Sequence, residues 1–212
     1  MSRSIDLKTW KRREHYQLFR RYAQPFFSLC VDVDATSLWR RSDSPGGPPF
    51  FLTSLFFMLR AANATEAFRL RLRKRGVWSH DHVAVGSALL RPDHTFTFAR
   101  IEWCSRREQF VAQGAKTIAE SQARKRLEPY ADPDDLVYHS SLPWLRFTSF
   151  TNAIRGTDSI PRIVFGQCSK EGRRFVMPVA VEVHHALVDG LDVARFLERF
   201  QQELSEFRRH ND

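Results

Sequence analysis

The stretch that decides the fold is Val179-Ala-Val-Glu-Val-His-His-Ala-Leu-Val-Asp-Gly190. Valines occupy every second position of its first half, which is typical of a β-strand with one buried face. Two histidines follow, and Asp189 and Gly190 then favour a tight turn into an amphipathic helix. A strand end is rigid and open to small molecules, which is what a general base requires of its surroundings. The stretch therefore predicts a strand, a turn and a helix with an imidazole at the strand rim.

The flanking chain divides into further strand-like and helix-like runs. Helices are expected at residues 12–22, from 34–36 to 39, and at 50–64, 105–127 and 191–208. Strands are expected at 27–33, within 68–104, and at 144–154, 159–168 and 174–183, with a hairpin turn at 170–172. These elements come in runs rather than in strict alternation. The pattern predicts one α+β domain over residues 1–212, a two-layer sandwich whose mixed, mainly antiparallel sheet is covered by helices.

Two helix starts carry capping signals. Asp34 or Thr36 is expected to cap the short helix through Trp39, since both side chains can accept a hydrogen bond from a first-turn N–H. Ser105 is expected to cap the long surface helix, with Glu108 completing a capping box.

The net charge of +9 is spread along the chain. Its only dense cluster runs from Arg69 to Arg75, where arginines alternate with Phe68, Leu70 and Leu72. Such alternation indicates a strand with one solvated face, and the cluster lacks the interleaved aromatics of a nucleic-acid platform. We expect no nucleic-acid partner; attraction for an anionic cofactor stays open as an alternative.

Other classes are also disfavoured. No run approaches the ~20 apolar residues that cross a bilayer, and the segment from Met1 to Lys11 lacks an apolar signal stretch, so we expect a cytoplasmic protein without membrane contact. Cys30, Cys104 and Cys168 are too widely spaced for a metal knuckle or a disulfide framework. We expect them to be small buried hydrophobes. No metal is expected.

A His-His pair on a strand is commonly a packing feature, and a shared metal is disfavoured because adjacent strand residues point to opposite faces. The HHxxxDG pattern of His184 to Gly190 changes this reading. It resembles the active-site signature of chloramphenicol acetyltransferases, of the acyltransferase core of 2-oxoacid dehydrogenase complexes, and of peptide-synthetase condensation domains.

Length and further matches separate these relatives. Condensation domains are about twice this size, and the dehydrogenase cores carry extra modules. The rest of the chain resembles type A chloramphenicol acetyltransferases in several blocks, in the right order: Ile5-Asp-Leu-Lys-Thr-Trp10-Lys-Arg12-Arg-Glu-His15-Tyr16, Phe27-Ser-Leu29, Asp34-Ala-Thr36, Ser141-Leu-Pro-Trp144, Phe147-Thr-Ser-Phe150, Met177-Pro178 and Val193-Ala-Arg-Phe196.

The resemblance implies roles for individual residues. His185 would be the general base that deprotonates a hydroxyl, which then attacks acetyl-CoA in a ternary complex. Ser140 would donate to the developing oxyanion, with Ser141 the alternative. Asp189 would form a structural ion pair with Arg12, or less favourably with Arg13. His184 is interpreted as a structural strand residue.

The resemblance also implies a homotrimer with active sites at subunit interfaces, where base and acceptor pocket come from different chains. The acceptor pocket positions are Phe19, Pro25, Phe27, Phe96 and Asn152. Chloramphenicol is the acceptor that the family suggests.

Several positions depart from the family pattern. Val164 replaces a frequent threonine, Pro49 and Gln167 replace basic side chains near the coenzyme A phosphates, and Cys168 replaces an aromatic near the adenine. In the acceptor pocket, Asn152 replaces an apolar residue and Phe98 a small one. Two alternatives therefore stay open: the same chemistry on another alcohol or amine, and a non-catalytic relative.

Overall fold

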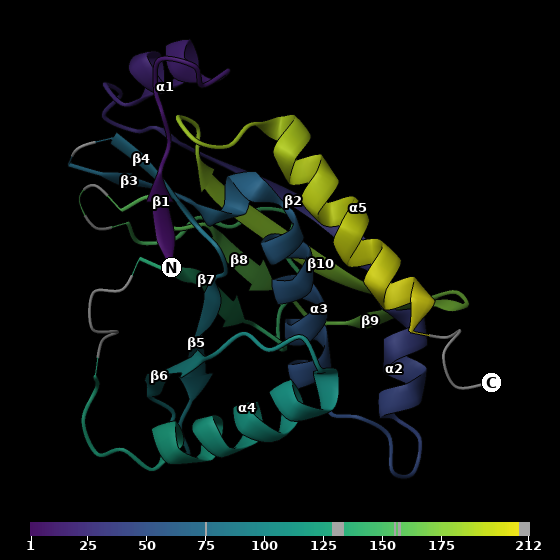
Figure 1. Ribbon diagram of the computed structural model, residues 1–212. Coiled ribbons are helices and arrows are strands. Elements are labelled where there is room, and N and C mark those ends of the chain that lie inside the picture. Colours follow the sequence, from purple (N-terminus) through teal and green to yellow (C-terminus); the bar gives the residue numbers. More distant parts are fainter. Residues whose placement is uncertain (75, 129–133, 155, 157, 208–212) are drawn as a thin grey trace.

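The computed structural model describes residues 1–74, 76–128, 134–154, 156 and 158–207 (Figure 1). The helices are α1 (Arg13–Phe19), α2 (Thr36–Ser42), α3 (Phe50–Ala64), α4 (Arg107–Gln122) and α5 (Gly190–Glu206), with a 3-10 turn η1 (Glu66–Arg69). The strands are β1 (Ser2–Ser4), β2 (Phe26–Asp34), β3 (Leu70–Arg73), β4 (Gly76–His80), β5 (Ala84–Leu90), β6 (Phe96–Ile101), β7 (Leu136–Ser141), β8 (Arg162–Phe165), β9 (Ser169–Glu171) and β10 (Arg174–His184).

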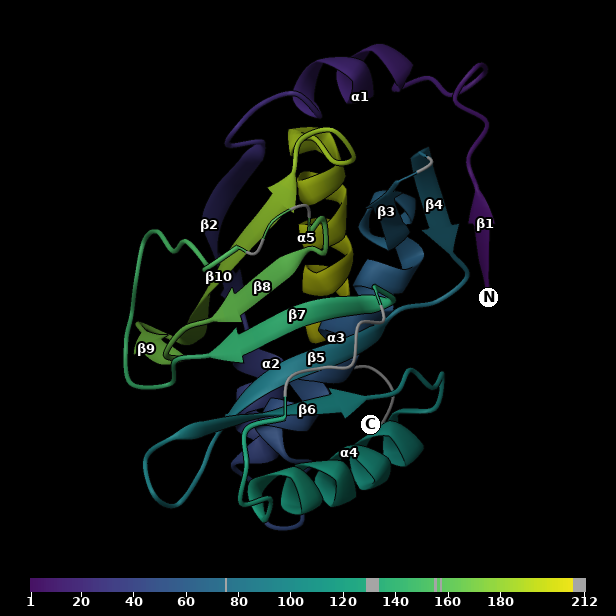
Figure 2. The same cartoon turned by 90° about the vertical axis from the view of Figure 1, so that its left-hand side faces the viewer.

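The strands form one large and one small sheet. The large sheet has the order β2-β10-β8-β7-β5-β6, with β9 paired to the start of β10. Only β5–β7 and β7–β8 are parallel, and the other neighbours are antiparallel. The small sheet has the order β1-β4-β3. Figure 2 shows the large sheet with α3 and α5 behind it. The expected α+β fold with a mixed, mainly antiparallel sheet is confirmed.

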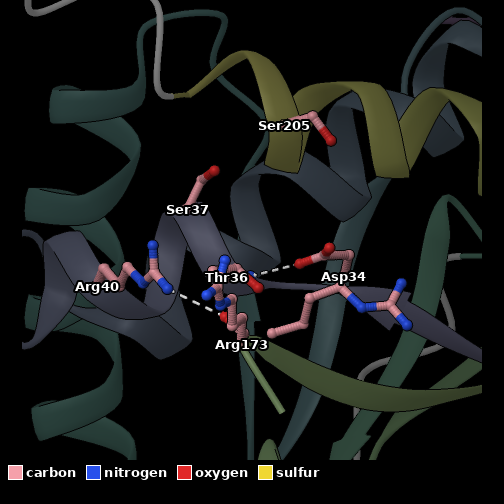
Figure 3. A pocket seen from close by; sticks show the side chains of 7 residues that line it. Asp34, Thr36, Ser37, Arg40, Arg173 and Ser205 are labelled. Atoms are coloured by element: carbon pink, nitrogen blue, oxygen red, sulfur yellow. Dashed lines mark hydrogen bonds between the residues drawn. The ribbon is translucent and has the colours of Figure 1, made fainter. Parts of the chain in front are cut away.

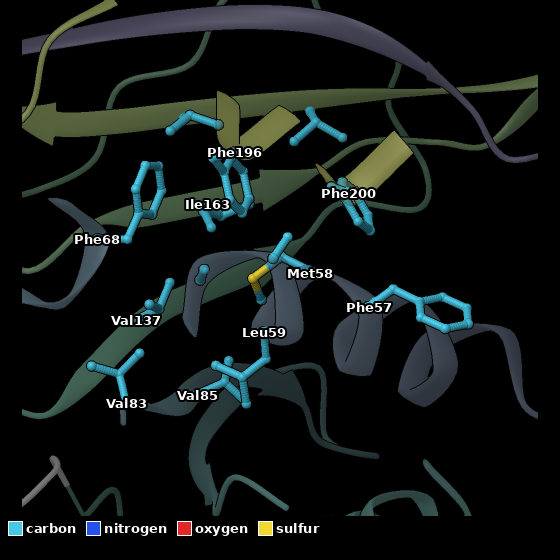
Figure 4. Close-up of a cluster of buried hydrophobic side chains, with 14 of the residues drawn as sticks. Phe57, Met58, Leu59, Phe68, Val83, Val85, Val137, Ile163, Phe196 and Phe200 are labelled. Atoms are coloured by element: carbon cyan, nitrogen blue, oxygen red, sulfur yellow. The ribbon is translucent and has the colours of Figure 1, made fainter. Parts of the chain in front are cut away.

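One face of the large sheet carries the core. Helix α3 matches its expected bounds, and most of its residues are buried because it is apolar on nearly all sides. It packs against α5, and both helices lie over the sheet (Figure 1). Aromatic rings join the elements of the core. Phe68 of η1 stacks on Phe196 of α5 with ring centroids 4.4 Å apart (Figure 4). Phe165 of β8 stacks on Phe200 of α5 at 5.6 Å.

Strand β10 positions the motif. It pairs with β2 along nine residues and with β8 along four, so it is fixed on both edges. The valines at 179, 181 and 183 are fully buried within the core cluster. The intervening residues Ala180, Glu182 and His184 therefore point to the opposite face. A hairpin forms as expected, but its turn is Gly172-Arg173 rather than 170–172, because Lys170 and Glu171 pair with β10 as part of β9. Gly172 adopts the positive φ of +58° that this turn needs.

The strand expected at 144–154 is wrong. The strand in this region is β7, and the chain then runs without regular structure from Leu142 to Ile154. Side chains of the edge strand β2 bind this segment instead of a ladder: Ser28 Oγ donates to the Phe150 carbonyl at 2.9 Å. The Cys30 thiol lies 3.6 Å from the Phe147 carbonyl. Aromatic residues here contact the sheet face without joining the sheet.

The expected caps are also corrected. Helix α4 begins one residue later than a Ser105 cap requires, with Arg106 at the N-cap and no capping side chain. Glu108 then falls one position short of the box and pairs with Arg107 instead. Helix α2 has Ala35 at its N-cap, although Asp34 Oδ1 accepts from the Thr36 N–H at 2.9 Å.

The arginine-rich segment is not a simple solvated face. Arg71 on β3 is fully buried, and its guanidinium donates to four main-chain carbonyls: Phe68, Leu70, Asp134 and Leu136. Burial lowers the pKa of Arg71 to about 10, against the opposing pull of Asp134. The cation is thus a structural link between β3 and the start of β7.

Smaller expectations also change. The first helix ends at Phe19 rather than Tyr22, and Arg208, the expected end of the last helix, lies outside the described residues. The three cysteines are half-buried rather than buried. In the described part of the chain, every helix is too short or too polar to cross a bilayer.

Candidate active site

The two-histidine turn joins β10 to α5. β10 ends at His184, whose carbonyl accepts from the N–H groups of Leu187 at 2.9 Å and Val188 at 3.1 Å. The N–H of His185 donates to the Pro25 carbonyl at 2.8 Å, which ties the turn to the chain just before β2. These hydrogen bonds fix the backbone of His185, and so they also fix the point from which its side chain extends.

The imidazole of His185 has a defined tautomer. Its Nδ1 lies 3.2 Å from the Val188 carbonyl. A carbonyl can only accept, so Nδ1 carries the proton and Nε2 carries the lone pair of the neutral ring. Phe19 stacks on the ring with centroids 4.0 Å apart, and Phe27 lies tilted at 4.8 Å. The ring is partly exposed, so Nε2 is an oriented proton acceptor.

An ion pair supports the same turn. Arg12 Nη1 binds Asp189, and Arg12 Nη2 donates to the carbonyl of His185 at 3.2 Å. Asp189 also caps α5, accepting from the N–H groups of Leu191 at 3.0 Å and Asp192 at 3.2 Å. Asp192 in turn accepts from the Asp189 N–H, which completes a capping box. Arg13 is exposed, and Arg12 is the arginine that reaches the motif.

The two acids of this box titrate differently. Burial pushes the pKa of Asp189 upward, but the Asp192 N–H and Arg12 outweigh it and hold that pKa below its usual value. Burial raises the pKa of Asp192, and the nearby charge of Asp189 adds to this shift. Asp189 is therefore the ionised partner of Arg12 and supplies no proton to His185.

Ser140 lies far from this turn in the same chain. In the sheet it stands level with Val164 on β8 and Ala180 on β10. His185 follows Ala180 by five residues, which is roughly 17 Å along the strand, and Ser140 is two strands, about 10 Å, to the side. Base and candidate oxyanion donor are not within reach of one substrate in a single chain.

The acceptor residues divide in the same way. Phe19, Pro25 and Phe27 surround the same chain's His185, which differs from the expectation that the whole pocket comes from another subunit. Phe96 lies on the opposite edge strand β6, 52% exposed, with its ring 5.4 Å from that of Phe98.

Asn152 has a polar partner that sequence reasoning missed. Its main-chain N–H and side-chain amide donate to Glu182 Oε2 at 3.1 and 2.8 Å. Glu182 is buried on the β10 face opposite the valines. The signal was present, since an acidic residue interrupts an otherwise apolar strand. His184, the next residue on that face, is buried against Phe26, as a structural residue should be.

Three of the positions that depart from the family pattern, Val164, Gln167 and Cys168, lie on or just after β8. Val164 is buried, and Gln167 is tied by its N–H to the Leu145 carbonyl at 2.8 Å. Burial raises the pKa of Cys168 to about 12, and the charge of Asp34 acts in the same direction. The Cys168 thiol therefore stays protonated at neutral pH and is no nucleophile. Pro49 is the N-cap residue of α3.

Comparison with known proteins gives a consistent result. The family model for chloramphenicol acetyltransferase matches residues 2–201. Chloramphenicol acetyltransferase 2 of Escherichia coli is 33% identical over 93% of this chain and 94% of its own. The enzyme of Streptomyces acrimycini is 31% identical over 95% and 94%. A solved chloramphenicol acetyltransferase superposes with a TM-score of 0.87 at 27% identity, covering 96% of this chain and 100% of that one. The chain is thus an acyltransferase that belongs to the chloramphenicol acetyltransferase family.

Proposed function

We propose that this chain transfers the acetyl group of acetyl-CoA to a hydroxyl of chloramphenicol, with His185 as general base. The observation that carries the proposal is the fixed tautomer of His185, which presents the Nε2 lone pair from a rigid strand end. Family membership over nearly the whole chain supports acetyl transfer and the choice of acceptor.

In the proposed reaction, one proton moves from the acceptor hydroxyl to His185 and then to the leaving thiolate. His185 Nε2 takes the acceptor's hydroxyl proton as the oxygen attacks the thioester carbonyl. The Ser140 hydroxyl donates to the oxyanion that develops on that carbonyl. When the carbon–sulfur bond breaks, the imidazolium returns its proton to the leaving thiolate. The products are an ester and free coenzyme A, and the protein needs no covalent intermediate.

The proposal includes a homotrimer. One chain keeps His185 and Ser140 too far apart, so a complete site requires a second copy that brings its Ser140 to the first copy's imidazole. Leu29 and Val31 on the edge strand β2 are 41% and 38% exposed, which suits a strand covered by a neighbouring subunit. Phe96 on the other edge would then contribute to the acceptor pocket across the seam.

A thiol-release assay tests the activity. Wild-type protein with acetyl-CoA and chloramphenicol is expected to release free coenzyme A, with initial-rate lines that intersect as a ternary complex requires. The matched control is chloramphenicol whose primary hydroxyl is blocked. Absence of thiol release with every acceptor, together with absence of coenzyme A binding, would favour a non-catalytic relative.

Subunit mixing tests the interface. His185→Ala and Ser140→Ala trimers are each expected to keep about 1% of wild-type activity or less, but after co-refolding, hybrid trimers contain some sites with both wild-type groups. Activity should return well above that of either parent. The control mixes His185→Ala with the double variant, in which no intact site can form. If the hybrids stay inactive while each parent folds as a trimer, the proposal that two subunits share each active site is wrong.

A different acceptor is the second candidate. Asn152 and the buried Glu182 pair with each other in the region assigned to the acceptor, so this region holds an amide and a carboxylate where the family pattern has an apolar residue. A hydroxyl-rich or amine acceptor would suit such a polar wall better than an apolar one. Thiol release with other alcohols or amines, but none with chloramphenicol, would select this reading and keep the His185 chemistry.

A further inference from the structure

A buried polar pair lies on the core face of the large sheet, in the residue before Ser140 and on the neighbouring strand. His139 on β7 is 3% exposed and Ser87 on β5 is fully buried, and the imidazole Nδ1 lies 3.0 Å from the Ser87 hydroxyl oxygen. Two aromatic rings pack against the imidazole, Phe165 with a centroid distance of 4.6 Å and Phe51 with one of 5.8 Å. The hydrogen bond between the two side chains therefore lies in an apolar environment.

Solvent does not satisfy this pair. The side chains around the surface cavity between α2 and the β9–β10 hairpin, such as Ser37 and Arg40, can bind water as well as protein groups (Figure 3). The imidazole Nε2 of His139, by contrast, is out of contact with solvent and has no hydrogen-bond partner among the described residues. Burial lowers the pKa of His139 to about 3, so the ring is neutral at neutral pH. A buried polar atom without a partner calls for an explanation.

The stability of the fold does not supply that explanation. A neutral hydrogen bond inside a protein contributes little net free energy, because the unfolded chain forms hydrogen bonds to water instead. The unpartnered Nε2 costs at least as much, since its desolvation is not compensated. An apolar side chain at position 139 would therefore be at least as stable, and Val137 occupies the same face two residues earlier in this way. The pair is better explained by what it holds in place.

The pair lies at the last rung between β5 and β7, which are side by side in Figure 2. These two strands are parallel, and their register ends at Ser87 and His139. β7 continues with Ser140 and Ser141, whose register partners in the described part of the chain are on β8. Because side chains alternate along a strand, the Ser140 hydroxyl points to the face opposite His139. The side-chain hydrogen bond thus fixes the backbone of β7 one residue before Ser140, where pairing with β5 ends.

We propose that His139, through its hydrogen bond to Ser87, is a positioning residue for Ser140. This inference rests on the proposed function, which makes Ser140 the donor to the oxyanion. Such a donor must lie within hydrogen-bond distance of an oxygen that becomes charged only in the transition state, so a small displacement of its backbone weakens the bond. The pair therefore acts on the rate of the chemical step and leaves substrate binding unchanged.

Steady-state kinetics of thiol release separate positioning from stability. His139→Leu removes the hydrogen bond together with the unpartnered nitrogen, so kcat should fall about fivefold, KM should stay within about twofold, and the melting temperature should not fall. Ser87→Ala breaks the same bond from the other side and should lower kcat to a similar extent. His139→Asn is the matched control, because its amide can take the place of Nδ1 and should keep kcat within about twofold of wild type. An unchanged kcat in His139→Leu overturns the proposal.

A second background shows whether His139 acts through Ser140. Ser140→Ala has no hydroxyl to position, so adding His139→Leu to it should lower kcat no further. Val137→Ala, a buried change on the same face of the same strand, is the structural control and should have the same effect on kcat with and without the Ser140 hydroxyl. An equal loss of kcat from His139→Leu in both backgrounds would mean a merely structural role and would refute the proposal.

Amide hydrogen exchange detects the same hydrogen bond without turnover. The Leu142 N–H, which donates to the Phe165 carbonyl at 2.8 Å just after β7, should exchange faster in His139→Leu and Ser87→Ala but not in His139→Asn. Unchanged exchange in the first two variants overturns the proposal. If no acceptor supports thiol release, or if Ser140→Ala keeps full activity, the proposed function fails in that part, whereas faster exchange still shows that the pair fixes this backbone.

Discussion

The two ends of β10 differ in how firmly their polar side chains are held. At the motif end, Arg12, Asp189 and the ring of His185 are each held by at least two contacts. At the hairpin end, Arg173 and Arg174 extend into solvent without partners among the described residues. Proton transfer needs atoms placed within fractions of an ångström, whereas charge attraction acts over a Debye length of about 8 Å. The same strand thus carries firmly held side chains at one end and solvent-exposed arginines at the other.

The largest effect should come from the motif end. His185→Ala removes the proton acceptor, and kcat should fall by about 10²- to 10⁴-fold in the thiol-release assay. The melting temperature should change little, because the ring is partly exposed. A variant that keeps kcat within threefold of wild type would end the assignment of this ring as the base.

The oxyanion donor should come next. Ser140→Ala is expected to lower kcat about 10²-fold with little change in KM, because the lost hydrogen bond forms only in the transition state. Ser141→Ala is the matched control, since it makes the same change one residue away and should stay close to wild type. The reverse ranking of the two variants would shift the role to Ser141.

The ion pair of Arg12 and Asp189 should contribute to the stability of the turn rather than to proton transfer. Asp189→Asn keeps a capping oxygen but removes the charge, and Arg12→Ala removes the partner. Each should lower the free energy of unfolding by about 1–2 kcal/mol, less than for a fully buried pair because Asp189 is 38% exposed. Urea melts with a double-mutant cycle measure the coupling. Additive losses would show that the pair does not stabilise the turn.

The last prediction concerns the pH dependence of stability, with no direct effect on the reaction at neutral pH. Burial lowers the pKa of His139 to about 3, and burial together with the charge of His185 lowers that of His184 to about 4. Unfolded histidine titrates near 6.5, so below that pH the unfolded chain binds more protons and stability falls.

The expected slope is up to about 1.4 kcal/mol per pH unit for each ring between about pH 6.5 and 5. Urea melts across this range measure it. His139→Gln should reduce the slope, whereas a variant at the exposed His15 should leave it unchanged. An identical slope in wild type and His139→Gln would refute the attribution.

Local signals made β10, its turn and α5 predictable. Alternating valines, a glycine turn and an amphipathic run lie within a few residues of one another, and α3 is apolar on nearly all sides. The pairing of Arg12 with Asp189 was foreseen through the family pattern, because 177 residues separate the two in sequence.

The sequence-based predictions were wrong or incomplete where the contacting residues lie far apart in the sequence. The aromatic segment before Ile154 has strand-like composition, yet Ser28 and Cys30 bind its carbonyls and no strand pairs with it. The role of Glu182 could not be predicted, because its partner Asn152 lies thirty residues earlier in the sequence. The gap between Ser140 and His185 follows from strand register, which single-sequence patterns do not specify.

The buried guanidinium of Arg71 has a mechanical consequence. It donates to the carbonyls of Phe68 and Leu70 beside the small sheet, and to those of Asp134 and Leu136 at the start of β7 in the large sheet. These hydrogen bonds fix the two sheets relative to each other. The small sheet anchors the chain that leads to Arg12, since the Ile5 N–H donates to the Val77 carbonyl at 2.9 Å. We therefore expect that substitutions at Arg71, far from the two-histidine turn, disturb the position of Arg12 and lower activity without touching any substrate.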